Sequence, residues 1–117
     1  MKTKEREHQV AVIAWAKAKE VEFPNLDLLH HCPNGGARNI VVARRLKGEG
    51  VKPGVPDLFL PVARKGFHGW YGELKAEKGK LSLSQEWWRY RLLQEGYKWG
   101  VFYDWQDAAD DLEEYLK

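Results

Sequence analysis

The chain has 117 residues, a length typical of one domain, and its 44% hydrophobic and 13% aromatic content is too apolar for a disordered chain. One cysteine excludes a disulfide framework or a zinc site built from several thiolates, and it fits a reducing compartment. No apolar run approaches the roughly 20 residues that cross a bilayer, and the charged start is unlike a signal peptide. We therefore expect one cytoplasmic domain over residues 1–117, without a membrane partner.

The net charge of +2 indicates little by itself, but the charges are unevenly distributed. Between Ala37 and Lys52 five basic residues accompany the single acid Glu49, whereas the stretch from Asp104 to Lys117 is strongly acidic. A basic middle is compatible with a face that binds phosphates. A solvated helix face explains the same charges equally well.

In chain order, Glu5 to Glu20 is expected to form a helix, with Val10, Ile13, Ala14 and Val21 on its apolar side. Pro24-Asn25 ends this helix, and Leu26 to Cys32 is predicted as a short strand closed by the turn Pro33-Asn34-Gly35-Gly36. A second helix is predicted over Asn39 to Lys47, ended by Gly48.

The remaining half is predicted to begin with a hairpin, whose strands cover Asp57 to Val62 and Phe67 to Ala76. Ser82 and Gln85 have the spacing of a capping box, which opens a helix that ends near Gly96. A strand over Tyr97 to Tyr103 and a last helix capped by Asp104 follow. The order α-β-α-β-β-α-β-α predicts an α/β fold in which helices flank a small mixed sheet.

Two carboxylates and a lysine in the hairpin carry the most chemical information. Glu73 and Lys75 lie on one face of their strand, and a turn centred near Gly66 places Asp57 opposite Lys75. Converging carboxylates repel each other unless a cation lies between them. Mg²⁺ binds such a pair, with the backbone carbonyl of Leu74 as a further ligand, and Lys75 would orient a nucleophilic water. A cross-strand salt bridge on a wet face is the alternative interpretation.

These residues lie within an ordered set of short motifs that resembles the virus-type replication-repair nuclease (VRR-NUC) domain of the PD-(D/E)xK superfamily. The set covers nearly the whole chain: Glu5 with Gln9, Pro33-Asn34-Gly35-Gly36, Arg38, Leu46-Lys47-Gly48, Gly54-Val55-Pro56-Asp57-Leu58, Glu73-Leu74-Lys75, Gly79, Leu81-Ser82, Gln85 and Gly96-Tyr97. The resemblance implies a restriction-endonuclease-like core of order α-β-β-β-α-β, here with an inserted helix and a C-terminal helix. It also implies a Mg²⁺- or Mn²⁺-dependent endonuclease.

The resemblance assigns site roles residue by residue. Asp57 and Glu73 match the metal-binding carboxylates, Lys75 the catalytic lysine, and Gln85 the supporting glutamine of the next helix. Glu5 aligns with the acid of the first helix, with Glu7 as the alternative. The viral members of the family in which this domain stands alone resemble Holliday-junction resolvases and form dimers. The resemblance therefore implies branched or flapped DNA as the substrate, a homodimer as the assembly and the host cytoplasm as the location.

Contacts with DNA are expected from the turn and from the basic stretch. Asn34 and Gly35 would bring backbone groups close to a phosphate, and the following cations would bind the DNA backbone without sequence preference: Arg38, Arg44, Arg45 and Lys47. A module that binds DNA junctions without cutting them is the alternative function, and the fold is also compatible with cleavage of RNA or of free ends.

Other chemically suggestive residues are expected to be structural. His30-His31-Cys32 lacks the spacing of metal ligands, and His8 is expected to be an ordinary surface histidine. Trp87 and Trp88 are adjacent on a helix, so at most one faces the core. The other is expected to be partly buried, to stack on a base or to fill a dimer contact.

Overall fold

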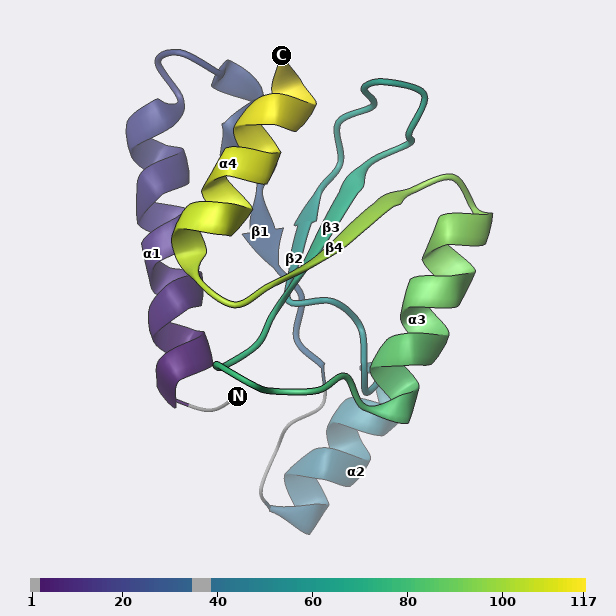
Figure 1. The fold of residues 1–117 in the computed structure, drawn as a ribbon. Coiled ribbons are helices and arrows are strands. Elements are labelled where there is room, and N and C mark those ends of the chain that lie inside the picture. Colours follow the sequence, from purple (N-terminus) through teal and green to yellow (C-terminus); the bar gives the residue numbers. More distant parts are fainter. Residues whose placement is uncertain (1–2, 35–38) are drawn as a thin grey trace.

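A four-stranded mixed sheet is the centre of the computed structural model, which describes residues 3–34 and 39–117 (Figure 1). The strands are β1 (His30–His31), β2 (Leu58–Leu60), β3 (Trp70–Leu74) and β4 (Lys98–Phe102), and they lie in the order β1-β2-β3-β4. β1 pairs with β2 and β2 with β3 in antiparallel fashion, whereas β3 and β4 are parallel. The parallel pair requires a crossover, and a helix supplies it.

The helices flank the sheet as the sequence predicts. They are α1 (Thr3–Lys19), α2 (Ile40–Gly48), α3 (Leu83–Gln94) and α4 (Trp105–Leu116). α1 and α4 lie side by side over one face, and α3 forms the crossover from β3 to β4 (Figure 1). α2, the inserted helix, has no buried residue and extends beyond the sheet. The predicted α/β fold, in which helices flank a small mixed sheet, is thereby confirmed.

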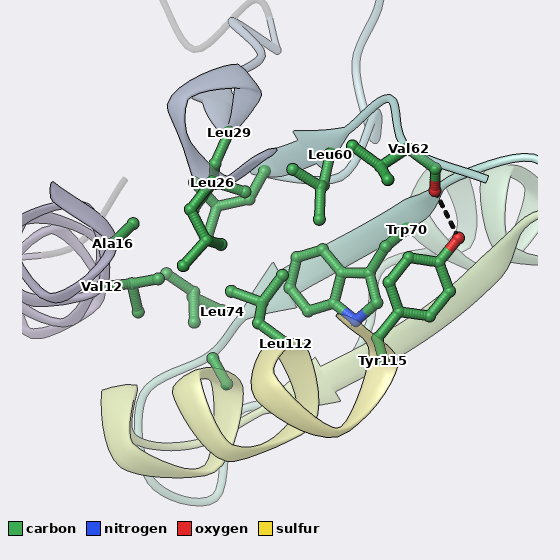
Figure 2. Packing of buried hydrophobic residues seen from close by; sticks show 12 residues of the cluster. Val12, Ala16, Leu26, Leu29, Leu60, Val62, Trp70, Leu74, Leu112 and Tyr115 are labelled. Atoms are coloured by element: carbon green, nitrogen blue, oxygen red, sulfur yellow. Dashed lines mark hydrogen bonds between the residues drawn. The ribbon is translucent and has the colours of Figure 1, made fainter. Parts of the chain in front are cut away.

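The main core fills the space between the sheet and the pair α1 and α4 (Figure 2). Trp70 and Tyr115 are its largest fully buried side chains. Their polar atoms are satisfied, because the Trp70 indole donates to Asp111 at 2.7 Å and the Tyr115 hydroxyl donates to the carbonyl of Val62 at 2.6 Å. Hydrogen-bonded rings of this size fix the sheet firmly against the two helices.

Two predictions about the first third of the chain are wrong. The predicted strand over Leu26 to Cys32 is a 3₁₀ helix, η1 (Pro24–Leu28), followed by the two-residue β1. Pro24 occupies the first turn of η1, and the resulting bend directs Leu26 and Leu29 into the core. The two leucines are three residues apart, which is the spacing of a helical turn, and a short apolar segment does not by itself distinguish a helix from a strand.

The core-facing side of α1 also differs from the prediction. Val12 and Ala16, one turn apart, are buried, whereas Val10 and Val21 are 62% and 95% exposed. Ile13 packs only partly against the core. α1 ends at Lys19, so Val21 is not part of the helix at all. The face of α1 that contacts the core determines which acid near its N-terminus, Glu5 or Glu7, points toward the sheet.

No helix in the described part of the chain is both long and apolar enough to cross a membrane.

Candidate active site

The hairpin of β2 and β3 brings two buried carboxylates together. Leu58 pairs with Gly72, so the neighbouring positions Asp57 and Glu73 face each other across the strands. The predicted register is therefore wrong by two residues, since it placed Asp57 opposite Lys75. A slip of two residues keeps every side chain on its own face, and both carboxylates remain on the face opposite Leu74, which lies in the core. Each carboxylate residue is only 2% exposed.

Asp57 is fixed by the backbone around it. Its Oδ2 accepts a hydrogen bond from the amide of Leu74 at 2.8 Å, which ties β2 to the end of β3. Its own carbonyl accepts from the amide of Cys32 at 2.8 Å and from Nδ1 of His31 at 2.8 Å. A carbonyl can only accept, so Nδ1 of His31 carries the hydrogen. β1 thus holds the Asp57 backbone in place.

Glu73 is held on one oxygen only. Its Oε1 accepts from Nε2 of Gln85 at 2.8 Å, whereas its buried Oε2 has no hydrogen-bond partner in the described structure. Gln85 is itself fixed by the predicted capping box, which is confirmed: its Oε1 accepts from the amide of Ser82, and the Ser82 hydroxyl accepts from the amide of Gln85. The start of α3 therefore positions Glu73.

Close packing at Gly54 brings α3 to the sheet. A Cβ added to Gly54 would lie 2.5 Å from the backbone of Ser84, and its φ of +87° suits only glycine. The loop that leads into Asp57 and the first turn of α3 therefore touch backbone to backbone. This contact sets the distance from Gln85 to the two carboxylates.

Burial and mutual repulsion perturb the acids. Burial, together with the charge of Asp57, raises the pKa of Glu73 to about 9, against the lowering effect of Lys75. Burial also raises the pKa of Asp57, against the effect of the Leu74 amide. Because both pKa values are raised, the two carboxyl groups together carry less negative charge in the absence of a cation than two fully ionised carboxylates would.

Of the two acids predicted for α1, the structure brings Glu5 to the site. Its Oε2 accepts from the amide of Ala76 at 3.3 Å, and its charge raises the pKa of Asp57. Glu7 is exposed. His8 accepts a hydrogen bond from the amide of Trp105 through Nδ1, so it stabilises the start of α4. His8 is therefore half-buried and structural, and the expectation of an ordinary surface histidine was wrong.

The predicted DNA-binding residues that the structure describes lie outside the hairpin of β2 and β3. Arg44, Arg45 and Lys47 are exposed on α2, which is below the sheet in Figure 1, and Asn34 is partly buried after β1. Gly35 and Arg38 lie outside the described residues. His31 was not singled out as a site residue, although it contacts the Asp57 backbone; no local sequence pattern predicts a contact between strands that are so far apart in the chain.

The residues fit a divalent cation of the magnesium type. Carboxylate oxygens are its preferred protein ligands. The Oε2 of Glu73, beside Asp57, has no hydrogen-bond partner in the described structure and is therefore available to bind a metal ion. The described residues contain no group of three or more His, Cys, Asp or Glu side chains arranged to hold a metal. Two carboxylates suffice for Mg²⁺, because this ion keeps several waters.

An antiparallel hairpin carrying the two acids, followed by a crossover helix and a parallel strand, is the architecture of a PD-(D/E)xK nuclease. The family model described as "VRR-NUC domain" matches residues 1–105, and the chain belongs to this family. A solved structure described as "VRR_NUC domain protein" is similar to the chain with a TM-score of 0.81 and 28% identity, over 99% of this chain and 90% of that one. A search of curated proteins finds no match.

Proposed function

We propose that the protein is a DNA endonuclease that uses Mg²⁺ or Mn²⁺ to hydrolyse phosphodiester bonds in branched DNA, such as Holliday junctions or flaps. The observation that carries the proposal is the buried pair of Asp57 and Glu73, with one partnerless carboxylate oxygen and Lys75 beside them. A salt bridge on a wet face, the alternative interpretation of these residues, is inconsistent with their 2% exposure.

Each residue of the site has a distinct role in this proposal. Asp57 and Glu73, with the Leu74 carbonyl, would hold the cation, which supplies Lewis-acid polarisation of the phosphodiester and lowers the pKa of the attacking water. Lys75 orients that water and balances the charge that develops on the phosphate. Gln85 keeps the Glu73 carboxylate in one orientation through its 2.8 Å hydrogen bond. Glu5 adds negative charge beside Asp57.

The DNA backbone would be bound by Asn34, by Gly35 and by four cations: Arg38, Arg44, Arg45 and Lys47. α2 supports this proposal, because it exposes its cations and buries none of its residues. A helix that contributes nothing to the core is free to be selected for an external partner. In Figure 1 α2 lies below the sheet, and its exposed cations would contact a duplex arm on that side.

We also propose that the protein acts in the cytoplasm as a homodimer. The sheet face that carries Asp57 and Glu73 continues into a cluster of partly exposed rings. Phe59 stacks on Tyr71 at 4.3 Å between centroids, and Tyr97 lies 5.3 Å from Tyr71. Apolar patches of this kind mark protein interfaces, and a twofold axis here would place two sites on one branched substrate.

Cleavage assays test the nuclease proposal. Purified protein is incubated with a four-way junction, a flap and a linear duplex in Mg²⁺, Mn²⁺ or EDTA. We expect cutting only with a metal, and preferentially on the branched substrates. Lys75→Ala should abolish cutting while DNA affinity changes less than about twofold; Lys80→Ala, in an exposed neighbouring position, is the matched control. Affinity for junctions without cutting under any condition would instead support the non-cleaving binding module.

Light scattering tests the dimer. We expect the mass of two chains, and Tyr71→Glu should convert the protein to monomers without unfolding it. Tyr90→Glu, on the 63% exposed surface of α3, should not change the mass. A monomer at micromolar concentration in the wild type would refute the dimer and leave the chemistry of each site unaffected.

A further inference from the structure

A cavity lies between segments that adjoin Asp57 in the chain and across the sheet. It is a cavity of about 270 Å³, open to the surface, whose mostly apolar lining includes Cys32, Pro33, Val51, Lys52, Val55 and Trp88. None of these residues has a part in the chemistry proposed above. The cavity therefore needs an explanation of its own.

The cavity is adjacent to the candidate active site through two segments. Val55 precedes Asp57 by two residues, so their Cα atoms are at most about 7 Å apart. Cys32 donates its amide hydrogen to the Asp57 carbonyl at 2.8 Å, so the other wall is joined to the same residue. A polymer whose phosphate lies at Asp57 therefore has its next unit within reach of the cavity.

Trp88 supplies a rigid aromatic wall. Its indole Nε1 donates to the carbonyl of Pro53 at 3.0 Å, and its ring meets Trp87 edge to face, with centroids 5.4 Å apart. A ring fixed at its polar end loses little freedom when a flat group stacks on it. Base stacking on such rings is independent of sequence, because every base has a π face.

The charges around the opening suit a nucleic acid. Lys52 lines the cavity, and the exposed cations of α2 precede it in the chain. The acid Glu49 also lines it, but Nε of Arg45 lies 4.0 Å from its carboxylate. An apolar pocket with a cationic surround matches a flat base attached to a phosphate backbone.

We propose that this cavity binds one unpaired nucleobase of the DNA substrate, adjacent to the bond that is cut. The proposal rests on the nuclease function above and deepens it. A paired base enters such a pocket only after leaving its stack, which costs unpairing energy. Bases at a flap or a branch point are already unpaired or weakly paired, so the pocket gives a physical reason for preferring branched DNA.

The test uses full-length protein in EDTA, so that DNA is bound but not cut, with fluorescence anisotropy on flap DNA and on linear duplex. Val51→Trp should fill the cavity, and Trp88→Ala should remove its wall. Each is expected to weaken flap binding by about tenfold and duplex binding by less than twofold. Trp88→Phe should restore most of the affinity. Trp87→Ala, at the 52% exposed neighbouring ring outside the lining, is the matched control.

A set of flaps with one abasic nucleotide, moved stepwise across the branch point, completes the experiment. At one position the missing base should weaken wild-type binding, and Val51→Trp should cause no additional loss there. Additive losses at every position, or equal effects of Trp87→Ala and Trp88→Ala, would overturn the proposal. A shift from dimer to monomer in Val51→Trp with unchanged flap affinity would assign the cavity to a second copy of the chain instead.

The two proposals fail separately. Because binding is measured in EDTA, absence of cutting by the wild type would refute the nuclease function without altering the binding result. Metal-dependent cutting that is unchanged in Val51→Trp would overturn only the base-binding pocket.

Discussion

Gln85 links the cap of α3 to the Glu73 carboxylate with a single side-chain amide. Its Oε1 accepts from the backbone of Ser82 at 2.8 Å, and its Nε2 donates to Glu73 at 2.8 Å. Glutamate at this position would serve the capping box equally well. Only glutamine can also donate to a carboxylate, so its second bond explains the choice of residue.

Replacement of Gln85 by glutamate should therefore separate the two roles. We expect Gln85→Glu to keep the α3 cap, because the carboxylate still accepts from Ser82, but to place a third acid against Glu73. Metal-dependent cutting should fall by about 10- to 100-fold at pH 7.5, in line with the loss of a group that orients a ligand. Circular dichroism should show unchanged helix content.

The control for this change is Gln85→Ala, which loses both bonds. It should lower stability by about 1 kcal/mol through the lost cap, measured by urea unfolding, and should reduce cutting as well. Full activity in Gln85→Glu would show that the 2.8 Å bond to Glu73 has no functional role.

The perturbed carboxylates predict how stability depends on pH in metal-free protein. The pKa of Glu73 is raised to about 9 in the folded state, from an ordinary value of 4.5. Folding therefore favours the protonated carboxyl, and this contribution is present below pH 4.5 and is lost as the pH rises toward 9. Glu73→Gln, which stays neutral, should melt about 5 °C or more above the wild type at pH 8 in EDTA.

The difference between the two proteins should vanish near pH 4, where the wild-type carboxyl is protonated in both states. Mg²⁺ should narrow the gap at pH 8 by stabilising the wild type alone. A constant difference in melting temperature from pH 4 to pH 8 would contradict the assignment of the raised pKa to Glu73.

Gly54 should tolerate no side chain. A Cβ there would lie 2.5 Å from the Ser84 backbone, and φ is +87°. Gly54→Ala is expected to lower stability by about 2 kcal/mol or more and to reduce cutting, because α3 and Gln85 must move away from the carboxylates. Gly48→Ala is the matched control, since nothing lies within 4 Å of its added Cβ. Equal melting temperatures for the two variants would refute this explanation.

The cations of α2 should determine how DNA affinity depends on salt. Each phosphate contact contributes about −0.9 to the slope of log K against log salt concentration on duplex DNA. The double variant Arg44→Ala and Arg45→Ala should make that slope less steep by up to about 2, with the fold intact because neither residue is buried. Binding titrations from 50 to 300 mM salt measure the slope. The control is Lys17→Ala, an exposed lysine in the last turn of α1, which should leave the slope unchanged.

The sequence predicted the hairpin and the proximity of Asp57 and Glu73, but it did not predict the register in which the two strands pair. Turn chemistry located the reversal near Gly66, whereas strand pairing depends on which side chains fill the core. The true pairing of Leu58 with Gly72 differs by two residues, and a period of two preserves the faces. Because the error in register was two residues, Asp57 and Glu73 were still correctly predicted to lie on the same face of the hairpin.

The first third of the chain was less predictable for a similar reason. The choice between Glu5 and Glu7 requires the rotation of α1 about its axis, which depends on the apolar stripe that faces the core. The stripe predicted from Val10 and Val21 was wrong, since Val12 and Ala16 are the buried residues. Glu5 was preferred through resemblance to a family, and local pattern alone did not distinguish the two acids.

The hydrogen bond between Glu5 and the amide of Ala76 joins residues 71 positions apart, and Glu73 requires Gln85 twelve positions further on. The site therefore cannot assemble while the chain is still emerging from the ribosome with α3 inside the exit tunnel. A nascent or proteolytically shortened chain that ends before α3 lacks Gln85, so nothing from that helix holds the Glu73 carboxylate in one orientation. The proposed site is therefore complete only after the chain that follows β3 has folded onto it.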